Sequence, residues 1–429
     1  MLELGLLTDT NKKETLLAYF EQEAELWLNW LASFTRGGEP GVTRLLYTKE
    51  WLAAQRALEG KMTELGLVPS FDEIGNLYGK IKGVQETAPS IITGSHIDTV
   101  VQGGKYDGAY GIVAGLLAID YLQRTYGQPV RSLEVVSLCE EEGSRFPMAY
   151  WGSGSVVGKR SFAQIDSLQD EEGISFREAM ADCGFGEGAG APARRADMAA
   201  YIEVHIEQGA VLEREGLSLG VVEAIAGQRR LKFTIGGESN HAGTTPMHMR
   251  RDALEGTSAM IGLLRQEAVR LGPPLVATVG RLQVLPNVVN VVPGKVEFTV
   301  DARHADGQQL DAFCRWTVDA FERIAAERGL DFACEEWFRE EPVPMNERLK
   351  KELDDICREL AIPSKRMVSG AGHDGQMFHH SCPTALLFVP SRGGISHSPD
   401  EYTSPKELAI GIMALAKLLY KLGYEGELL

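Results

Sequence analysis

IITGSHIDTV (residues 91–100) is the stretch from which the fold can be predicted, because its β-branched run ends in polar residues, as a buried strand does. GIVAGLLAIDYLQRTYG (111–127) follows, with apolar residues at helical spacing and a closing glycine. SLEVVSLC (132–139) is a second strand-like run. A strand, a helix and a strand within about 50 residues form a βαβ crossover. We therefore predict a parallel or mixed sheet covered by helices.

On either side of this unit, the 429-residue chain changes twice in its pattern of predicted helices and strands. The first ~85 residues favour helices at 16–34 and 49–67, with Thr48 as an N-cap, and a strand (384–390) and a helix (407–424) lie near the other end. Between them, strands and helices alternate as β-α-β-β-α-β, the ferredoxin-like pattern of a small domain. We predict a ferredoxin-like domain at 222–340, inserted with hinges into a larger α/β domain at 1–221 and 341–429.

The composition limits the classes of partner that the protein can bind. The chain is 44% apolar and 24% charged, which is ordinary globular usage, and its formal charge of −17 disfavours nucleic acid and anionic membranes. No apolar run reaches roughly 18 residues, and the start lacks the layout of a signal peptide, so we expect a cytoplasmic protein. Six scattered cysteines predict reduced thiols and no cysteine zinc site.

Histidines next to acidic residues are the candidates for chemistry. His96 and Asp98 are two apart, so on a strand they share a side, and Asp98 could fix one ring nitrogen while the other binds a metal. Asp107 lies among glycines and could bridge two cations, although an isolated YDG is more often a turn. His205 could be a ligand or a core histidine, whereas His397 follows a strand in a loop, where ligands are common.

Together these residues favour a pair of divalent cations, because imidazole and carboxylate suit both Zn²⁺ and Mn²⁺. One more carboxylate must stay off the metals as general base. The triple glutamate 140–142 follows the strand at 132–139 and could supply both a ligand and that base.

Eight motifs in this order resemble the dimetal aminoacylase and carboxypeptidase superfamily over nearly the full length. They are GSHIDTV, KYDGAYG, EEEGSRF, HIEQG, GESNHAGTTPM, PNVVNVVPG, SGAGHDG and GISHSPDE. They are most similar to its ureido-hydrolysing branch of allantoate amidohydrolases, N-carbamoyl-L-amino-acid amidohydrolases and β-ureidopropionases. The resemblance implies a mixed-sheet, dimetal aminopeptidase-like α/β domain with an inserted lid and dimerisation domain. Peptidase members tend to carry an acidic residue where this chain has Gly108, which counts against peptide cleavage.

The resemblance also implies a metal set. It places His96 and Glu142 on one side of two Mn²⁺ or Zn²⁺ ions, Asp107 as the bridge, and His205 and His397 completing the set. The ligand glutamate lies about 35 positions after the bridging aspartate in the family and precedes a Gly-x-Arg-Phe string.

Both cues point to Glu142 as the ligand and Glu141 as the base. The alternative register, with Glu140 as base and Glu141 as ligand, stays open.

Substrate contacts are implied in the same way. His241 would stabilise the oxyanion in a neighbouring subunit's site, which requires at least a homodimer; without the resemblance it would be an exposed loop histidine. Arg230, Asn290 and Arg303 align with positions that bind the substrate carboxylate, although either arginine could instead form a structural salt bridge. Gln208 and His373 would contact the ureido group.

The implied substrate is a small ureido acid. Allantoate is favoured because TRLLYTKEWL, EEEGSRFPMAYWGS, GTTPMHMRRDAL and EEPVPMN look most like allantoate amidohydrolases, with ureidoglycine, ammonia and carbon dioxide as products. An N-carbamoyl-L-amino-acid amidohydrolase is the nearest alternative. A dipeptidase and a non-catalytic binding protein are the more distant ones.

Overall fold

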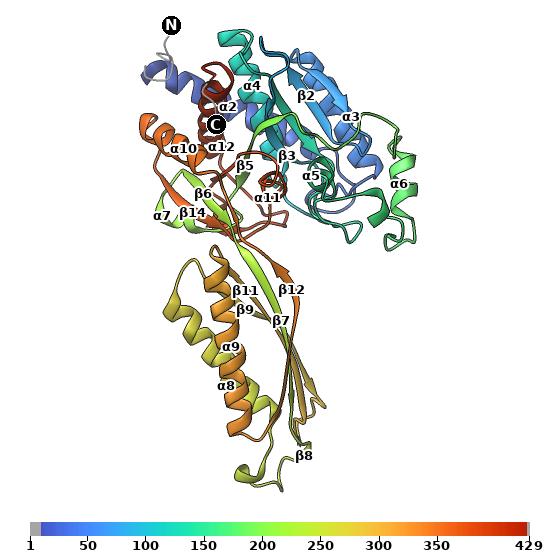
Figure 1. The fold of residues 1–429 in the computed structure, drawn as a ribbon, viewed down its shortest axis with the longest axis vertical. Coiled ribbons are helices and arrows are strands. Elements are labelled where there is room, and N and C mark those ends of the chain that lie inside the picture. Colours follow the sequence, from blue (N-terminus) through green and yellow to red (C-terminus); the bar gives the residue numbers. More distant parts are fainter. Residues whose placement is uncertain (1–9, 427–429) are drawn as a thin grey trace. The chain divides into compact units, whose positions relative to one another are not determined.

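The computed structural model describes residues 10–426, so the ends of the predicted larger domain, residues 1–9 and 427–429, lie outside it (Figure 1). The chain separates into two compact units. The larger consists of the residues up to Glu223, Met345–Met367 and the residues from His373 onward. The smaller consists of Ala224–Pro344 and Val368–Gly372, so it interrupts the larger one.

A mixed nine-stranded sheet forms the centre of the larger unit; the last two residues of β6 and of β14, and both residues of β13, belong to the ranges of the smaller unit. The order is β1-β2-β4-β3-β5-β15-β6-β13, and β14 pairs with β6. The strands are β1 (Val68–Phe71), β2 (Leu77–Ile81), β3 (Ser90–His96), β4 (Leu133–Leu138), β5 (Met198–Ile206), β6 (Leu219–Ile225), β13 (Val343–Pro344), β14 (Ser364–Ser369) and β15 (Thr384–Val389). The predicted mixed α/β sheet is confirmed.

Four central strands run in parallel: β3 pairs with β4 and β5, and β15 pairs with β5. Their carboxyl ends therefore meet at one edge of the sheet. The crossover from β3 to β4 is the buried helix α4 (Ala109–Tyr126), as predicted. In open α/β sheets ligands bind beyond this edge, which makes it the place to look for a site.

Helices cover both faces of the sheet. Side chains alternate along β3, so Ile91 joins the core shared with α2, α4 and α12, whereas Ile92 joins Phe378 of α11 on the other face. Thr48 accepts a hydrogen bond from the Trp51 N–H and caps α3, as predicted. The helices are α2 (Thr10–Ala32), α3 (Lys49–Glu64), α4, α5 (Trp151–Val156), α6 (Phe176–Asp182), α7 (Val211–Glu215), α10 (Glu347–Glu359), α11 (Gly375–Phe378) and α12 (Pro405–Gly423).

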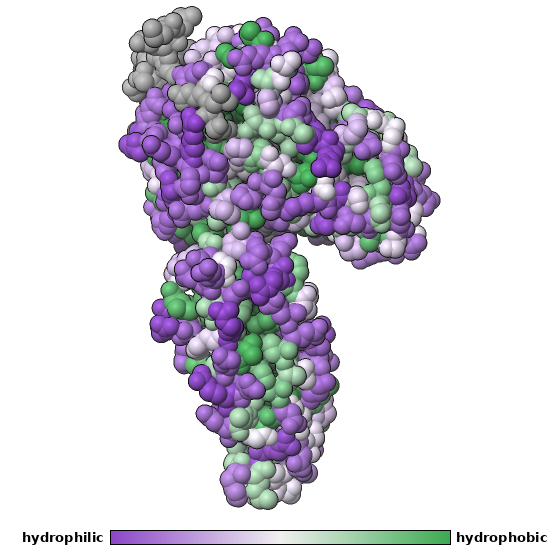
Figure 2. Space-filling model, viewed as in Figure 1, coloured by the Kyte–Doolittle hydropathy of each residue, from purple (hydrophilic) through white to green (hydrophobic). Residues whose placement is uncertain are grey.

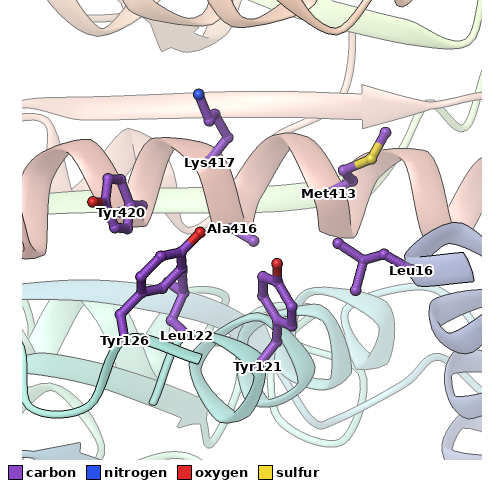
Figure 3. Close-up of a pocket in the computed structure, with 8 residues that line it drawn as sticks. All are labelled: Leu16, Tyr121, Leu122, Tyr126, Met413, Ala416, Lys417 and Tyr420. Carbon is purple, nitrogen blue, oxygen red and sulfur yellow. The ribbon is translucent and has the colours of Figure 1, made fainter. Parts of the chain in front are cut away.

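The packing of α2, α4 and α12 leaves a void of about 10 Å³ (Figure 3). Leu16, Tyr121 and Met413 line it, and Lys417 points away from it, toward an ion pair with Glu359 at 3.0 Å. A void of this size holds about one water molecule, so it is a packing defect and not a ligand site.

The smaller unit is an antiparallel four-stranded sheet, order β12-β7-β11-β9, packed against two helices. Its chain order, β7-α8-β9-β11-α9-β12, confirms the predicted ferredoxin-like pattern. A short ladder, β8 with β10, follows the end of β7. The elements are β7 (Gly227–Gly236), β8 (Asn240–His241), α8 (Ala253–Leu271), β9 (Val276–Leu285), β10 (Val291–Val292), β11 (Lys295–His304), α9 (Gly307–Glu327) and β12 (Asp331–Glu340).

Hydrophilic residues cover most of the visible face of the larger unit (Figure 2). Among the described helices, none combines the length and the apolar character that a membrane crossing requires.

Candidate metal and active site

Five predicted metal ligands come together at the carboxyl ends of the parallel strands. His96 ends β3, His205 lies near the end of β5, and Asp107 lies two residues before the start of α4. Glu142 follows β4, and His397 lies in the loop after β15. Elements from four separate stretches of chain therefore deliver donor atoms to one place.

Asp107 lies at the centre of this cluster. Its Oδ1 is 3.4 Å from His96 Nε2 and 3.1 Å from His205 Nε2, and its Oδ2 is 3.2 Å from His397 Nε2. His397 Nε2 is also 3.4 Å from Glu142 Oε1. Three groups have ligand atoms within 4.8 Å of one another: His96 with Asp107 and His205, Asp107 with Glu142 and His397, and His96 with Glu141 and Glu142.

The hydrogen bonds of the buried histidines leave Nε2 as the ligand atom. His96 Nδ1 donates to the Asp98 carbonyl at 3.0 Å, and His205 Nδ1 donates to the Ile206 carbonyl at 2.9 Å. Each Nε2 then faces an Asp107 oxygen, and two lone pairs at this distance repel unless a proton or a cation lies between them. The donor set of three imidazoles and two carboxylates therefore fits divalent cations, with Asp107 shared between two of the groups.

The pKa values of the histidines support a cation site. Burial opposes protonation of His96, but hydrogen bonds to Asp107 and Asp98 outweigh it and raise its pKa well above the usual value. The hydrogen bond to Asp107 raises the pKa of His397 to about 9. The cluster thus binds protons when no metal is present, and a cation would compete with these protons.

Two residues of the site have backbone conformations that side chains other than glycine seldom adopt. His397 has φ 53° and Gln208 has φ 56°. Such conformations persist where surrounding contacts impose them, and they concentrate at functional sites.

The three glutamates have three different surroundings. Glu140 is fully buried and its Oε1 accepts the Gly143 N–H, while its other oxygen has no hydrogen-bond partner among residues 10–426. Glu141 approaches His96 and Glu142, and Glu142 approaches Asp107 and His397. Burial raises the pKa of Glu141 well above its usual value and that of Glu142 to about 7. A buried carboxyl with a raised pKa next to a metal cluster suits proton transfer.

Asp98 organises this segment. Its two oxygens accept the backbone N–H groups of Glu141 at 3.0 Å and Glu142 at 3.1 Å, and Oδ1 lies 3.3 Å from His96 Nδ1. The aspartate therefore holds the glutamate turn and the histidine ring in one arrangement.

The predicted ureido contacts, Gln208 and His373, also lie in the larger unit. Gln208 Nε2 donates to Asp107 Oδ2 at 2.9 Å and to Ser396 Oγ at 3.2 Å. The His373 ring packs edge-on against His205 with centroids 4.6 Å apart. Burial lowers the pKa of His373 well below its usual value, so this ring is neutral.

The remaining predicted residues lie at two ends of the smaller unit. His241 and Asn290 are exposed; His241 lies in the β8–β10 ladder and Asn290 directly before β10, and the Ala242 N–H donates to the Asn290 carbonyl. Arg230 and Arg303 both pair with Asp301, through Nε atoms at 3.1 and 2.9 Å. Each arginine thus forms a structural salt bridge, the alternative role that the sequence did not exclude.

Sequence reasoning missed several residues that hold the site. Glu401 accepts the N–H groups of Tyr106 and Asp107. Glu203 joins Ser95 Oγ at 2.7 Å to the Gly375 N–H at 2.9 Å. The one available signal was a charged residue inside an apolar strand, as in IEVHI, or inside a recognised motif, as in GISHSPDE.

Comparisons with known proteins show the family of the chain. The model of peptidase family M20/M25/M40 matches residues 92–421, and the chain belongs to this family. Two relatives are named allantoate amidohydrolase. The one from Bacillus subtilis is 49% identical over 93% of this chain and 97% of its own, and the one from Escherichia coli is 45% identical over 96% and 100%.

More distant relatives carry other names. An N-carbamoyl-L-amino acid amidohydrolase from Geobacillus stearothermophilus is 36% identical over 95% of this chain and 100% of its own. Among solved structures, a hydantoinase/carbamoylase family amidase from Burkholderia multivorans superposes with a TM-score of 0.89. It is 34% identical and covers 93% of this chain and 97% of its own.

Proposed function

We propose that the protein is a metal-dependent amidohydrolase that cleaves the ureido C–N bond of allantoate, giving ureidoglycine, ammonia and carbon dioxide. The observation that carries the proposal is the cluster in which Asp107 lies within 3.4 Å of three imidazoles, with Glu141 and Glu142 beside it. The two relatives at 49% and 45% identity support allantoate as the substrate.

We propose that His96, Asp107, Glu142, His205 and His397 hold two divalent cations, Mn²⁺ or Zn²⁺. When bound, such ions lower the pKa of a water molecule and polarise the carbonyl under attack. The cations would also neutralise part of the negative charge of the Asp107 and Glu142 carboxylates.

The chain's own residues would then move the proton and hold the geometry. Glu141 would take a proton from the attacking water and deliver it to the leaving nitrogen, as its buried, raised-pKa carboxyl allows. Asp98 would keep Glu141 and His96 in place through the contacts described above. Glu140, whose carboxylate is turned to the Gly143 N–H, would support the turn.

For substrate binding we propose Arg230, Arg303 and Asn290 as contacts of the carboxylate, and Gln208 and His373 as contacts of the ureido group. A guanidinium fork pairs with a carboxylate in two parallel hydrogen bonds, and the two arginines supply positive charge in a protein of net charge −17. Their shared partner Asp301 holds both side chains near one another.

We propose a homodimer in which His241, together with its neighbour Asn290, serves the neighbouring subunit. The end of β7 that leads to His241 is six residues from Arg230, about 20 Å of strand, so one smaller unit cannot present both groups at one substrate. The β9 strand is an open sheet edge with exposed apolar side chains, among them Val276 and Leu282. Such an edge favours pairing with a second copy.

Mixing two inactive variants tests this sharing. If His241 acts in the partner's site, combining His241→Ala with Glu141→Gln creates mixed dimers in which one site has both groups. Activity should then return to about a quarter of the normal level at equal amounts with random exchange. If His241 serves its own chain, the mixture stays inactive.

A substrate panel tests the activity itself. The protein, freed of metal and reloaded with Mn²⁺ or Zn²⁺, should release ammonia from allantoate. Turnover of N-carbamoyl-L-amino acids without turnover of allantoate would replace the first proposal by its alternative. Turnover of dipeptides alone would indicate a peptidase, and binding without turnover a non-catalytic protein. The cytoplasmic location stays a prediction that fractionation of expressing cells can test.

A further inference from the structure

Glu401 joins the two loops that carry Asp107 and His397. Its Oε1 accepts the backbone N–H of Tyr106 at 2.9 Å and that of Asp107 at 3.1 Å. Its Oε2 accepts the hydroxyl of Ser396, the residue before His397, at 2.9 Å. The residue is 5% exposed, so these hydrogen bonds are shielded from water. One carboxylate thus links segments almost 300 residues apart in the chain.

The loop before Asp107 is shaped around this carboxylate. A Cβ at Gly104 would lie 1.9 Å from Glu401 Oε1 and 2.6 Å from its Cβ, so any larger residue would displace the glutamate. Both carboxylate oxygens of Glu401 accept hydrogen bonds, and none of the three sets of candidate metal ligands includes this residue. Glu401 is therefore placed to hold ligands and not to be one.

Ser396 connects Glu401 to the Asp107 carboxylate. Ser396 Oγ lies 3.3 Å from Asp107 Oδ2, and Gln208 Nε2 donates to both of these atoms. A change at Glu401 would therefore alter the position of the Asp107 backbone and, through Ser396, the orientation of its side chain. His397 would shift as well, because its strained backbone follows Ser396 directly.

We propose that Glu401 is a positioning residue that sets the spacing between Asp107 and His397, and so the affinity for the cation that these two residues share. This inference rests on the proposed metal-dependent function. Partners that lie behind metal ligands change metal affinity or activity by about 10- to 100-fold when removed, and Glu401 contacts the segments of two ligands at once.

Three variants test the proposal: Glu401→Ala, Glu401→Gln and the control Glu73→Ala. Glutamine keeps an oxygen for the two backbone N–H groups and can donate to Ser396, so it should preserve the spacing. Glu73 also accepts two backbone N–H groups, from Gly188 and Ala193, but none of its hydrogen bonds reaches the metal cluster. Mn²⁺ binding is measured from the paramagnetic resonance signal of free Mn²⁺, and unfolding is followed with a chelator present.

The expected result is that Glu401→Ala weakens binding of one Mn²⁺ equivalent by about 10- to 100-fold, while Glu401→Gln and Glu73→Ala change it by less than about tenfold. At saturating Mn²⁺ the KM for allantoate should stay unchanged. Wild-type affinity for both equivalents in folded Glu401→Ala would overturn the proposal and leave only a structural role. If the wild-type protein itself binds no Mn²⁺ or Zn²⁺, the proposed function fails instead.

Discussion

Replacing Glu141 by glutamine separates proton transfer from metal binding. The two side chains have nearly the same shape, and the Glu141 backbone is held by Asp98 whatever the side chain carries. We therefore expect the metal to be retained. Loss of a general base slows turnover by about 10²- to 10⁴-fold, which corresponds to about 3–5 kcal/mol in the activation free energy.

The surroundings of Glu141 also predict the effect on stability. Burial raises the pKa of this carboxyl well above its usual value, so folding has to oppose its ionisation. An amide has no such cost, and the midpoint of thermal unfolding should stay the same or rise. Ammonia release from allantoate, metal content by mass spectrometry and thermal unfolding together measure all three expectations.

The neighbouring glutamates serve as controls. Glu140→Gln should keep turnover and metal, because an amide oxygen can still accept the Gly143 N–H. Glu142→Gln should lose metal, because this carboxylate faces His397 and Asp107. The reasoning is refuted if Glu140→Gln is the inactive, metal-loaded protein and Glu141→Gln remains active, since the base would then lie one position earlier.

Three further outcomes follow from the fold and the site. Gly94→Ala should destabilise the protein by about 3 kcal/mol or more in urea unfolding, because φ is 145° and the new Cβ would lie 2.0 Å from the Val136 carbonyl oxygen. Glu134→Gln should cost about 3 kcal/mol at pH 7, because buried Glu134 pairs with Arg195 at 2.6 Å. The ion pair lowers the pKa of Glu134 below 4.5, so its stabilisation is complete above that pH and is lost as the pH falls through the lowered pKa. At low pH the free energies of unfolding of the wild type and Glu134→Gln should therefore converge. A chelator should stop ammonia release, and restoring Mn²⁺ or Zn²⁺ to about 100 times its Kd should stabilise the fold by about 2.7 kcal/mol in thermal unfolding.

The residue patterns of short segments were sufficient to predict much of the fold. The β-branched run ending at His96, the helical spacing of residues 111–127 and the next strand correctly predicted the βαβ crossover. The alternating strands of the smaller unit likewise predicted its ferredoxin-like order. These features depend on neighbours within a few residues, where periodicity and burial are directly coupled.

Local pattern was not sufficient for the contacts of the site. The sequence left each arginine with two roles, and the structure pairs both Arg230 and Arg303 with Asp301. The motif GISHSPDE includes Glu401, but the sequence did not show that this residue accepts hydrogen bonds from a loop almost 300 positions earlier. The Arg230–Asp301 pair and the Glu401 contacts join distant segments, so no periodicity along the chain predicts them.

The sequence by itself therefore determined the family, the donor types and the strands that carry them, because motifs and side-chain periodicity are properties of short segments. Only the tertiary structure decided which donors meet. Four parallel strands end at one edge of the sheet, and this brings His96, His205 and His397 within 3.4 Å of Asp107 from distant parts of the chain. The physical reason is that hydrogen-bonded strand register and the packing of buried helices, not spacing along the chain, set these distances.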